Sequence, residues 1–246
     1  MTTPLITVTD LTMGWGDDNL LEHQSFEVLQ GEVFAILGRS GCGKSTLLRY
    51  MIGLEEPKGG TLAIEGLGAP TLGVGRPPYG VMFQSGALFG SMTVGENLAL
   101  ALTEWTDLPS DAVSAIVRAK LRLVGLQGSE HKRPSELSGG MKKRAAIARA
   151  MALEPSLIFL DEPSAGLDPV SAVELDELIL ALSTGLGLTV VLVTHELESI
   201  FKVAARCILL DRESKSIIAR GDPRDLRESS GRPEVHQFFN RTTKDA

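Results

Sequence analysis

The chain has 246 residues, enough for one large α/β domain or for a core domain that carries a smaller subdomain. Its 24 Lys and Arg residues against 31 Asp and Glu residues give a net charge of −7, so the broad basic surface of a nucleic-acid-binding protein is not expected. Two cysteines, Cys42 and Cys207, are too few for a disulfide scaffold or a zinc cluster and fit a reducing compartment. The first ten residues lack the basic-then-apolar pattern of a signal peptide, so none is expected.

The first 30 residues alternate apolar and polar side chains, which is typical of strands with one buried face. We therefore expect an antiparallel portion that covers one edge of the main sheet. Farther along, short runs rich in Val, Ile and Leu lack this alternation, and they are Val33–Leu37, Leu157–Leu160, Thr189–Val193 and Cys207–Leu210. Such runs predict strands buried on both faces of a mostly parallel sheet, and the helical segments between them indicate an α/β sandwich.

Directly after the first run comes a match to the P-loop pattern G-x-x-x-x-G-K-[ST], formed by Gly38, Arg39, Ser40, Gly41, Cys42, Gly43, Lys44 and Ser45. A helical stretch starting at Thr46 follows, so a strand and a helix flank the loop as the motif requires. The glycines let backbone N–H groups surround phosphate oxygens, and the helix N-terminus adds positive potential. Lys44 would bridge the β- and γ-phosphates of ATP, and Ser45 would be a ligand of Mg²⁺.

The middle of the chain differs from both ends. Gly66 to Pro78 is rich in glycine and proline, which predicts a loop. From about Ser85 to Leu153 no convincing core strand is visible. Ser110 can cap a helix there, and a second helix is expected from about Met141 to Leu153. This region is predicted to be a helical subdomain inserted into the α/β core.

The second apolar run ends in two carboxylates, Asp161 and Glu162. Asp161 could hold Mg²⁺ through water, as the Walker-B aspartate does. Glu162, one residue beyond the strand, could polarise an attacking water. An acidic pair after a strand is more often only a solvated turn, but next to a P-loop it predicts a catalytic pair.

The stretch from Leu178 to Thr194 contains no charged residue and raises the question of a membrane span. A spanning helix needs about 20 predominantly apolar residues, and Gly185 and Gly187 interrupt this stretch. We expect a helix end, a turn and the buried strand Thr189–Val193. Any membrane role would then come through a partner.

Between the P-loop and the acidic pair lies Leu137-Ser138-Gly139-Gly140-Met141, followed by a helix rich in Lys and Arg. Ser-Gly-Gly alone is a common loop sequence. In this order it resembles the signature motif of the ATP-binding cassette (ABC) ATPases. Further positions that match the family are Gln84 for the Q-loop, Ser164–Asp168 for the D-loop, His195 for the switch histidine and Trp15 for the aromatic that stacks on adenine. The resemblance extends from about Thr7 to Asp222.

The resemblance implies a P-loop NTPase (RecA-like) α/β core with an antiparallel β portion and an inserted α-helical subdomain at approximately 85–153. One ABC ATPase domain would span residues 1–230, with ATP and Mg²⁺ as cofactors. The implied catalytic residues are Glu162, His195, Gln84 and Lys44. The implied ligands of Mg²⁺ are Ser45, Gln84 and Asp161. The implied nucleotide-binding residues are Trp15, the P-loop residues 38–45, Thr46, and Ser138, Gly139 and Gly140 of the signature.

One position departs from the family, which usually has Gln where this chain has Met141. Met cannot offer an amide hydrogen bond, so we do not count it as a nucleotide contact. The chain contains one P-loop and one signature. The resemblance therefore implies a head-to-tail ATPase homodimer, in which each signature closes onto ATP held by the other subunit.

Three segments, Phe83–Phe89, Leu137–Met141 and Val235–Phe239, resemble the ATPases of the bacterial Mla phospholipid-transport systems, part of the wider MCE-associated group. This resemblance implies phospholipid transport between bacterial membranes, with a membrane permease subunit and an MCE-type lipid-binding protein as partners. The chain would lie at the cytoplasmic face of the inner membrane and meet the permease around Gln84 to Asn97. The alternative is the ATPase of a generic exporter or small-solute importer.

Other classes within the family fit less well. A DNA-repair or chromosome-organising ATPase would carry a long coiled coil or zinc insertions between Lys44 and Leu137, and neither is visible. A ribosome-associated ABC protein would carry tandem cassettes. A regulatory nucleotide binder is disfavoured because Glu162 is intact. No nucleic-acid partner is expected.

The end of the chain, residues 231–246, follows a plausible domain end at Gly221–Pro223. Val235, Phe238 and Phe239 form an apolar cluster in a short polar context, whereas terminal residues are normally loose unless they are held by contacts. This cluster predicts a tail that docks on a partner, such as the neighbouring ATPase subunit.

Overall fold

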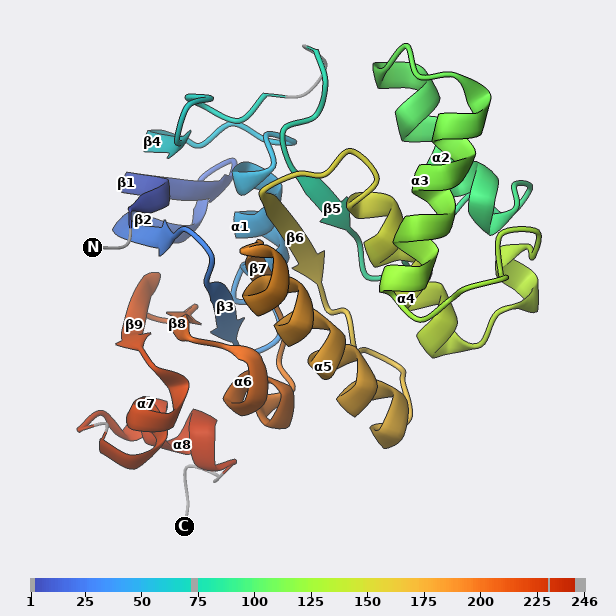
Figure 1. Ribbon diagram of the computed structural model, residues 1–246. Coiled ribbons are helices and arrows are strands. Elements are labelled where there is room, and N and C mark those ends of the chain that lie inside the picture. The colour runs from blue at the N-terminus through green and yellow to red at the C-terminus, as the bar shows by residue number, and fades with distance from the viewer. Residues whose placement is uncertain (1–2, 72–74, 230, 242–246) are drawn as a thin grey trace.

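The computed structural model describes residues 3–71, 75–229 and 231–241. Its centre is a six-stranded sheet (Figure 1). In spatial order its strands are β5 (Gly80–Met82), β6 (Leu157–Asp161), β7 (Thr189–Val193), β3 (Val33–Gly38), β8 (Arg206–Asp211) and β9 (Ser216–Gly221). Neighbouring strands from β5 to β8 are parallel, and β9 is antiparallel to β8. The four apolar runs thus form the strands predicted for them.

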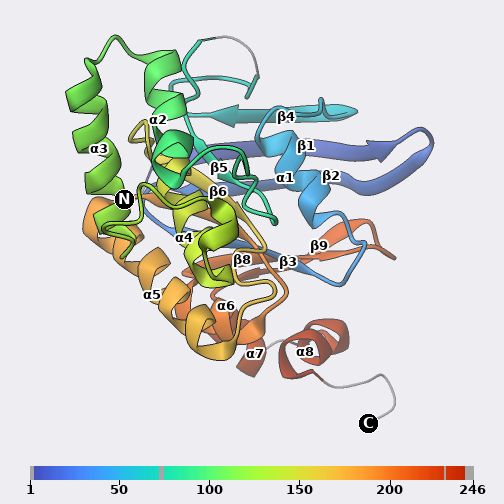
Figure 2. The same ribbon diagram turned by 90° about the vertical axis from the view of Figure 1, so that its right-hand side faces the viewer.

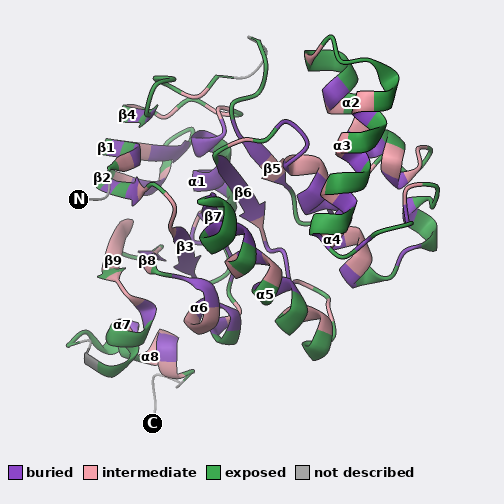
Figure 3. Ribbon diagram, viewed as in Figure 1, coloured by how far each residue is buried: buried purple, intermediate pink, exposed green. Residues whose placement is uncertain are grey.

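The central strands β6 and β7 are apolar except for one terminal residue each, because each of their faces packs against a different part of the core (Figure 3). Successive side chains of a strand point to opposite faces. On β6, Ile158 and Leu160 join the core shared with the helical subdomain, whereas Leu157 and Phe159 join the core on the other side. The absence of polar alternation in the sequence therefore reflects burial on both faces.

The antiparallel portion forms a separate three-stranded sheet in the order β2 (Asp18–Leu29), β1 (Pro4–Trp15) and β4 (Gly59–Ile64). This sheet does not join the main sheet, whose edge strands are β5 and β9, but its strand β2 lies against the edge strand β9. Its apolar face shares one core with the main sheet and with helix α1 (Lys44–Met51). One-sided strands need a second layer to bury their apolar face, and α1 supplies part of that layer.

The predicted helical subdomain is present between β5 and β6 (Figure 1). It contains α2 (Val94–Trp105), α3 (Ser110–Leu123), the 3₁₀ turn η1 (Pro134–Glu136) and α4 (Gly139–Ala150). The expectation that Ser110 caps a helix was wrong: Pro109 occupies the N-cap position and Ser110 is the first helical residue. Proline lacks an N–H group and fixes its own φ angle, which makes it suitable at a helix start.

The last third of the chain supplies α5 (Pro169–Leu186), α6 (Leu197–Val203), α7 (Pro223–Ser229) and α8 (Pro233–Asn240). The uncharged stretch is a helix end, a turn with Gly187 at a φ of 64°, and the buried strand β7, as predicted. Within the described residues, no helix combines the length and the apolarity that a membrane crossing requires.

Helix α8 packs against the domain that precedes it (Figure 2). Val235 and Phe239 are buried together with Leu37 of β3, Leu209 of β8 and Ile200 of α6. The described part of the tail therefore packs on the core of the protein, and the domain boundary at residue 230 stays a prediction. Residues 230 and 242–246 lie outside the described residues, and docking of the tail on a partner stays a prediction.

We expect Phe239→Ala to lower the free energy of unfolding by about 3–5 kcal/mol, because it empties the space of a buried aromatic ring. Phe239 is 2% exposed. Urea unfolding measures the effect, and His236→Ala, at an exposed position of the same helix, is the control. Equal stability of the Phe239 variant and the unsubstituted chain would contradict a structural role for α8.

Candidate nucleotide-binding site

The P-loop runs from the end of β3 into the first turn of α1. Gly43 holds the N-cap position of α1 with a φ of 100°, a conformation that glycine adopts without steric cost. A Cβ atom at Gly38 would lie 2.3 Å from the Cys42 sulfur and 2.8 Å from the Leu210 carbonyl oxygen. Glycine at these positions therefore allows the backbone to turn tightly and to present its N–H groups and the helix N-terminus to an anion.

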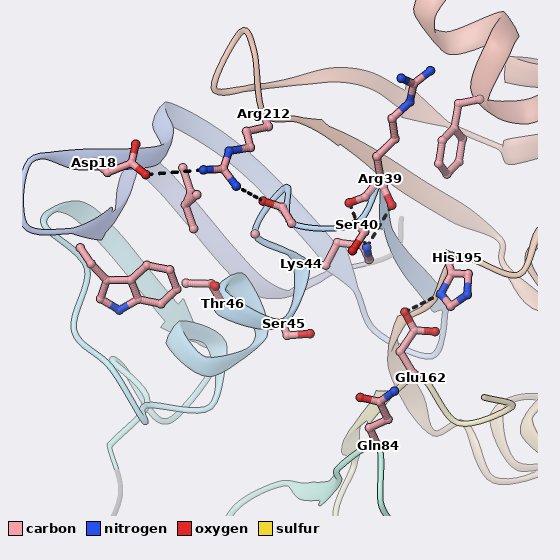
Figure 4. A pocket seen from close by; sticks show the side chains of 16 residues that line it. Asp18, Arg39, Ser40, Lys44, Ser45, Thr46, Gln84, Glu162, His195 and Arg212 are labelled. Carbon is pink, nitrogen blue, oxygen red and sulfur yellow. Dashed lines mark hydrogen bonds and ion pairs between the residues drawn. The ribbon is translucent and has the colours of Figure 1, made fainter. Parts of the chain in front are cut away.

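The loop opens into a pocket of about 700 Å³ between the β1–β2 turn, the P-loop and the ends of β6 and β7 (Figure 4). Asp18 and Thr46 lie toward one end of the pocket, and Gln84, Glu162 and His195 lie toward the other. Its lining comprises Trp15, Asp18, Leu20, Gly38, Arg39, Ser40, Gly41, Gly43, Lys44, Ser45, Thr46, Gln84, Glu162, His195, Arg212 and Phe238. Most of the residues that the family resemblance assigned to ATP thus share one cavity.

Trp15 closes β1 and is paired in register with Asp18 across the turn. Its side chain is 55% exposed, although tryptophan is usually well buried. An indole that lines a pocket with one free face can stack on a planar base. The geometry is therefore compatible with the expected contact to adenine.

Lys44 is a buried cation inside the P-loop. Its Nζ donates hydrogen bonds to the carbonyl oxygens of Gly38 at 3.0 Å and Arg39 at 3.3 Å. These bonds hold the ammonium group at the base of the pocket. A phosphate bound in the loop would meet both this charge and the N–H groups around it.

Ser45 and Asp161 bring two hard oxygen ligands together. The Ser45 hydroxyl donates to Asp161 Oδ1 at 3.4 Å. Burial raises the pKa of the Asp161 carboxyl group, and the adjacent Glu162 raises it further. In the described part of the chain, no cluster of three or more His, Cys, Asp or Glu side chains could hold a metal. The pair fits Mg²⁺, which takes few protein oxygens and fills its shell with water and phosphate.

Glu162 has an uncommon backbone conformation, and its two carboxylate oxygens have different surroundings. Its φ angle is 46°, which is uncommon for a residue with a Cβ atom. Oε1 lies 2.9 Å from His195 Nδ1, whereas Oε2 is buried without a hydrogen-bond partner among the described residues. One oxygen is therefore fixed by the histidine, and the other is a buried acceptor whose hydrogen-bonding capacity is unused among the described residues.

Some expected nucleotide contacts do not line this pocket. Cys42 is buried, and its thiol lies in the core behind the loop. Ser138 and Gly139 are exposed at the start of α4, whereas Gly140 is buried. Ser138 Oγ accepts a hydrogen bond from the Met141 N–H at 3.3 Å and so caps the helix. The signature is therefore partly exposed and does not line the pocket of its own chain.

The structure adds residues that the sequence motifs missed. Arg212 donates to the Gly41 carbonyl oxygen at 3.1 Å and lies 3.7 Å from the Asp18 carboxylate. It thereby connects the P-loop with the turn that carries Trp15. Arg212 follows β8, and the carboxyl ends of parallel strands are where ligands bind in such sheets. That rule could have identified it, but no rule would have placed Phe238 of α8 in the lining.

Comparison with known proteins agrees with this geometry. A family model described as "ABC transporter" matches residues 21–165. The "Intermembrane phospholipid transport system ATP-binding protein MlaF" of Escherichia coli strain K12 is 39% identical over 241 residues, which covers 96% of this chain and 88% of the relative. The "Probable ribonucleotide transport ATP-binding protein mkl" of Mycobacterium leprae is 40% identical over 240 residues, which covers 96% of this chain and 68% of the relative.

Two solved structures share the fold. CbiO1 of Clostridium perfringens, described as part of the ABC transporter complex cbiONQ, superposes with a TM-score of 0.80 at 27% identity and covers 91% of this chain and 90% of its own. The dimeric ATP-binding cassette MJ0796, bound to ADP and Pi, gives 0.77 at 26% identity, with 88% of this chain and 98% of its own covered. The family match, the two relatives and the shared pocket agree, and this chain belongs to the ABC transporter family as one of its ATPases.

Proposed function

We propose that this chain powers phospholipid transport between bacterial membranes through a membrane-spanning permease. The observation that carries the ATPase chemistry is the Glu162–His195 pair, which faces Lys44 across one pocket. The lipid substrate is supported by the similarity to MlaF over 88% of that protein. An MCE-type lipid-binding protein would be a further partner, and the chain would work at the cytoplasmic face of the inner membrane.

A second candidate is the transport of ribonucleotides or another small solute. It is favoured by the name of the mycobacterial relative, which is 40% identical. This chain spans 68% of that relative's length and 88% of the length of MlaF. The more complete correspondence with MlaF is our reason for placing phospholipid first.

In the proposed reaction each group has a distinct role. Lys44 neutralises charge on the phosphates, and Ser45, Asp161 and Gln84 would hold Mg²⁺, which supplies further positive charge to the phosphate oxygens. Glu162 orients and polarises the attacking water through its unpartnered carboxylate oxygen. His195 holds the other carboxylate oxygen and so fixes the orientation of the base.

The site is proposed to be completed by a second copy of the chain in a head-to-tail homodimer. Ser138 and Gly139 present an exposed helix N-terminus on the surface, where backbone N–H groups favour an anion. The related cassette MJ0796 has been solved as a dimer bound to ADP and Pi. The signature of one subunit would therefore close onto ATP in the pocket of the other.

The proposed contact with the permease is an apolar groove of about 440 Å³ between β5 and the helical subdomain, lined in part by Phe89, Leu100 and Trp105. Phe89 is 52% exposed. The buried Asn97 side chain accepts from the Phe89 N–H at 2.7 Å and donates to its carbonyl oxygen at 3.1 Å, so the Phe89 backbone is held in place. Val94, which we expected in this surface, is fully buried. A rigid apolar groove of this kind fits an apolar helix of a partner.

We expect Glu162→Gln to lower kcat about 10²–10⁴-fold while ATP affinity is retained, because the amide keeps the shape but cannot act as a base. Phosphate release measures turnover, and nucleotide titration measures affinity. Substantial turnover in this variant would remove Glu162 from the role of base.

We expect Ser138→Arg to abolish hydrolysis, since a long cation would obstruct closure of the signature onto the other subunit. Lys44→Ala should be inactive because the charge that faces the phosphates is lost. Mixing the two inactive chains should restore part of the turnover, because a mixed dimer contains one site with neither lesion. Normal hydrolysis by Ser138→Arg alone, or no recovery on mixing, would contradict the shared site.

We expect Phe89→Asp to weaken capture of the permease at least tenfold, about 1.4 kcal/mol, because it places an unpaired charge in the contact. Leu67→Asp is the control, since Leu67 is also 52% exposed but lies outside the groove. Equal capture by both variants would contradict the docking site.

The substrate is tested separately with the complex reconstituted in vesicles. Transfer of ribonucleotides without transfer of phospholipid would favour the second candidate.

A further inference from the structure

Lys143 is a buried cation that no motif of the family assigns, and it lies on α4 beyond the signature. It is only 8% exposed. Its Nζ donates to the main-chain carbonyl oxygen of Gln84 at 2.5 Å and to that of Glu162 at 3.2 Å. One ammonium group therefore joins three segments that are distant in the sequence: the signature helix, the Q-loop and the end of β6.

The charge of Lys143 is unusual for its position. Its buried neighbours Ala145, Ala146, Ile147 and Ala148 supply the small and apolar side chains that a packed helix face requires. Burying an ammonium group is costly unless it gains hydrogen bonds and opposite charges. Burial lowers the pKa of Lys143, whereas the nearby carboxylates, Glu162 foremost among them, raise it. An apolar residue would satisfy helix packing, so packing does not explain the lysine.

The hydrogen bond from Lys143 to the Glu162 carbonyl oxygen stabilises a backbone in the left-handed region. Left-handed φ angles at residues other than glycine persist only where surrounding contacts hold them. The Glu162 N–H donates to the Val193 carbonyl oxygen at 2.8 Å, and the Glu162 carbonyl oxygen accepts from the Ala165 N–H at 3.2 Å as well as from Lys143. Of these contacts, only the one from Lys143 comes from the helical subdomain.

We propose that Lys143 is a positioning residue, which fixes Glu162 and Gln84 relative to the signature helix. Through this lysine, a movement of α4 shifts the main chain that carries the water-polarising carboxylate and the Q-loop glutamine together. Closure of the signature on one ATP is thereby coupled to the alignment of the other site in the dimer. The inference rests on the proposed function, because it takes Glu162 as the base.

The test compares Lys143→Met, Lys143→Gln and Lys143→Arg in the ATPase purified with its membrane partner. Met keeps the apolar stem but donates no hydrogen bond, and Arg keeps both charge and donors. Lys120→Met is the matched control, since the Lys120 side chain is 12% exposed and pairs with Glu154 at 3.0 Å, away from the site. Steady-state kcat and KM, nucleotide affinity and melting temperature are measured for each variant.

We expect Lys143→Met to lower kcat about 10–100-fold, because misplacement of a catalytic group slows the chemical step. The KM and nucleotide affinity of Lys143→Met should stay within about twofold of the unsubstituted chain. Lys143→Arg should recover most of kcat, and Lys120→Met should match the unsubstituted chain. A kcat within about twofold of normal in Lys143→Met would overturn the inference. The inference would also be overturned if Lys120→Met lowered kcat equally, or if the nucleotide affinity of Lys143→Met fell in parallel with its kcat.

Two further comparisons keep the outcome decisive. If Lys143→Met does not fold, Lys143→Gln replaces it, because the shorter glutamine amide cannot reach both carbonyl groups. The kcat of Lys143→Gln should fall while its KM stays constant. Equal kcat in Lys143→Gln, Lys143→Arg and the unsubstituted chain would refute the positioning role. Glu162→Gln is assayed in parallel. Loss of turnover there with normal turnover in Lys143→Met refutes this inference alone, whereas turnover retained in Glu162→Gln refutes the proposed base and this inference with it.

Discussion

Burial of the central sheet on both faces is the constraint on which the rest of the structure depends. Side chains of β6 and β7 alternate between two apolar cores, so neither face of these strands leaves room for polar chemistry. Polar and charged groups can gather only where the strands end. The P-loop, Asp161, Glu162 and His195 all lie at or just past such an end, and the pocket forms there. Its position thus follows from the packing of the core.

Electrostatics in and around the pocket follow from the same burial. Lys44, Lys143 and Glu162 are each less than one tenth exposed, and Asp161 is partly buried beside them. Charges of opposite sign therefore stand close together where solvent screening is weak, and each depends on hydrogen bonds for its placement. The unpartnered oxygen of Glu162 is the exception among the described residues of the pocket. An acceptor without a partner in the same pocket as a buried cation suits a site that orients water against a phosphate.

The helical subdomain carries both of the surfaces that we propose contact other subunits. It exposes the signature at the start of α4 and the apolar groove around Phe89, while its interior is continuous with one face of the sheet. Because the core is shared, the subdomain and the catalytic strands cannot shift independently without repacking. Lys143 adds a polar connection to this apolar one. In its proposed role, Lys143 transmits a movement of α4 to Glu162 through a direct hydrogen bond.

The sequence by itself determined the buried strands, the P-loop, the acidic pair and the presence of the helical subdomain, because local patterning and motif spacing depend on residues near one another in the chain. It could not determine that β1, β2 and β4 form a separate sheet, or that α8 packs on the core and brings Phe238 to the pocket. It also gave no sign of Arg212 bracing Gly41 or of Lys143 reaching Gln84 and Glu162. These contacts join segments far apart in the chain through main-chain carbonyl groups, which every residue possesses and no side-chain pattern reveals. Only the tertiary structure decides which of those groups a buried cation meets.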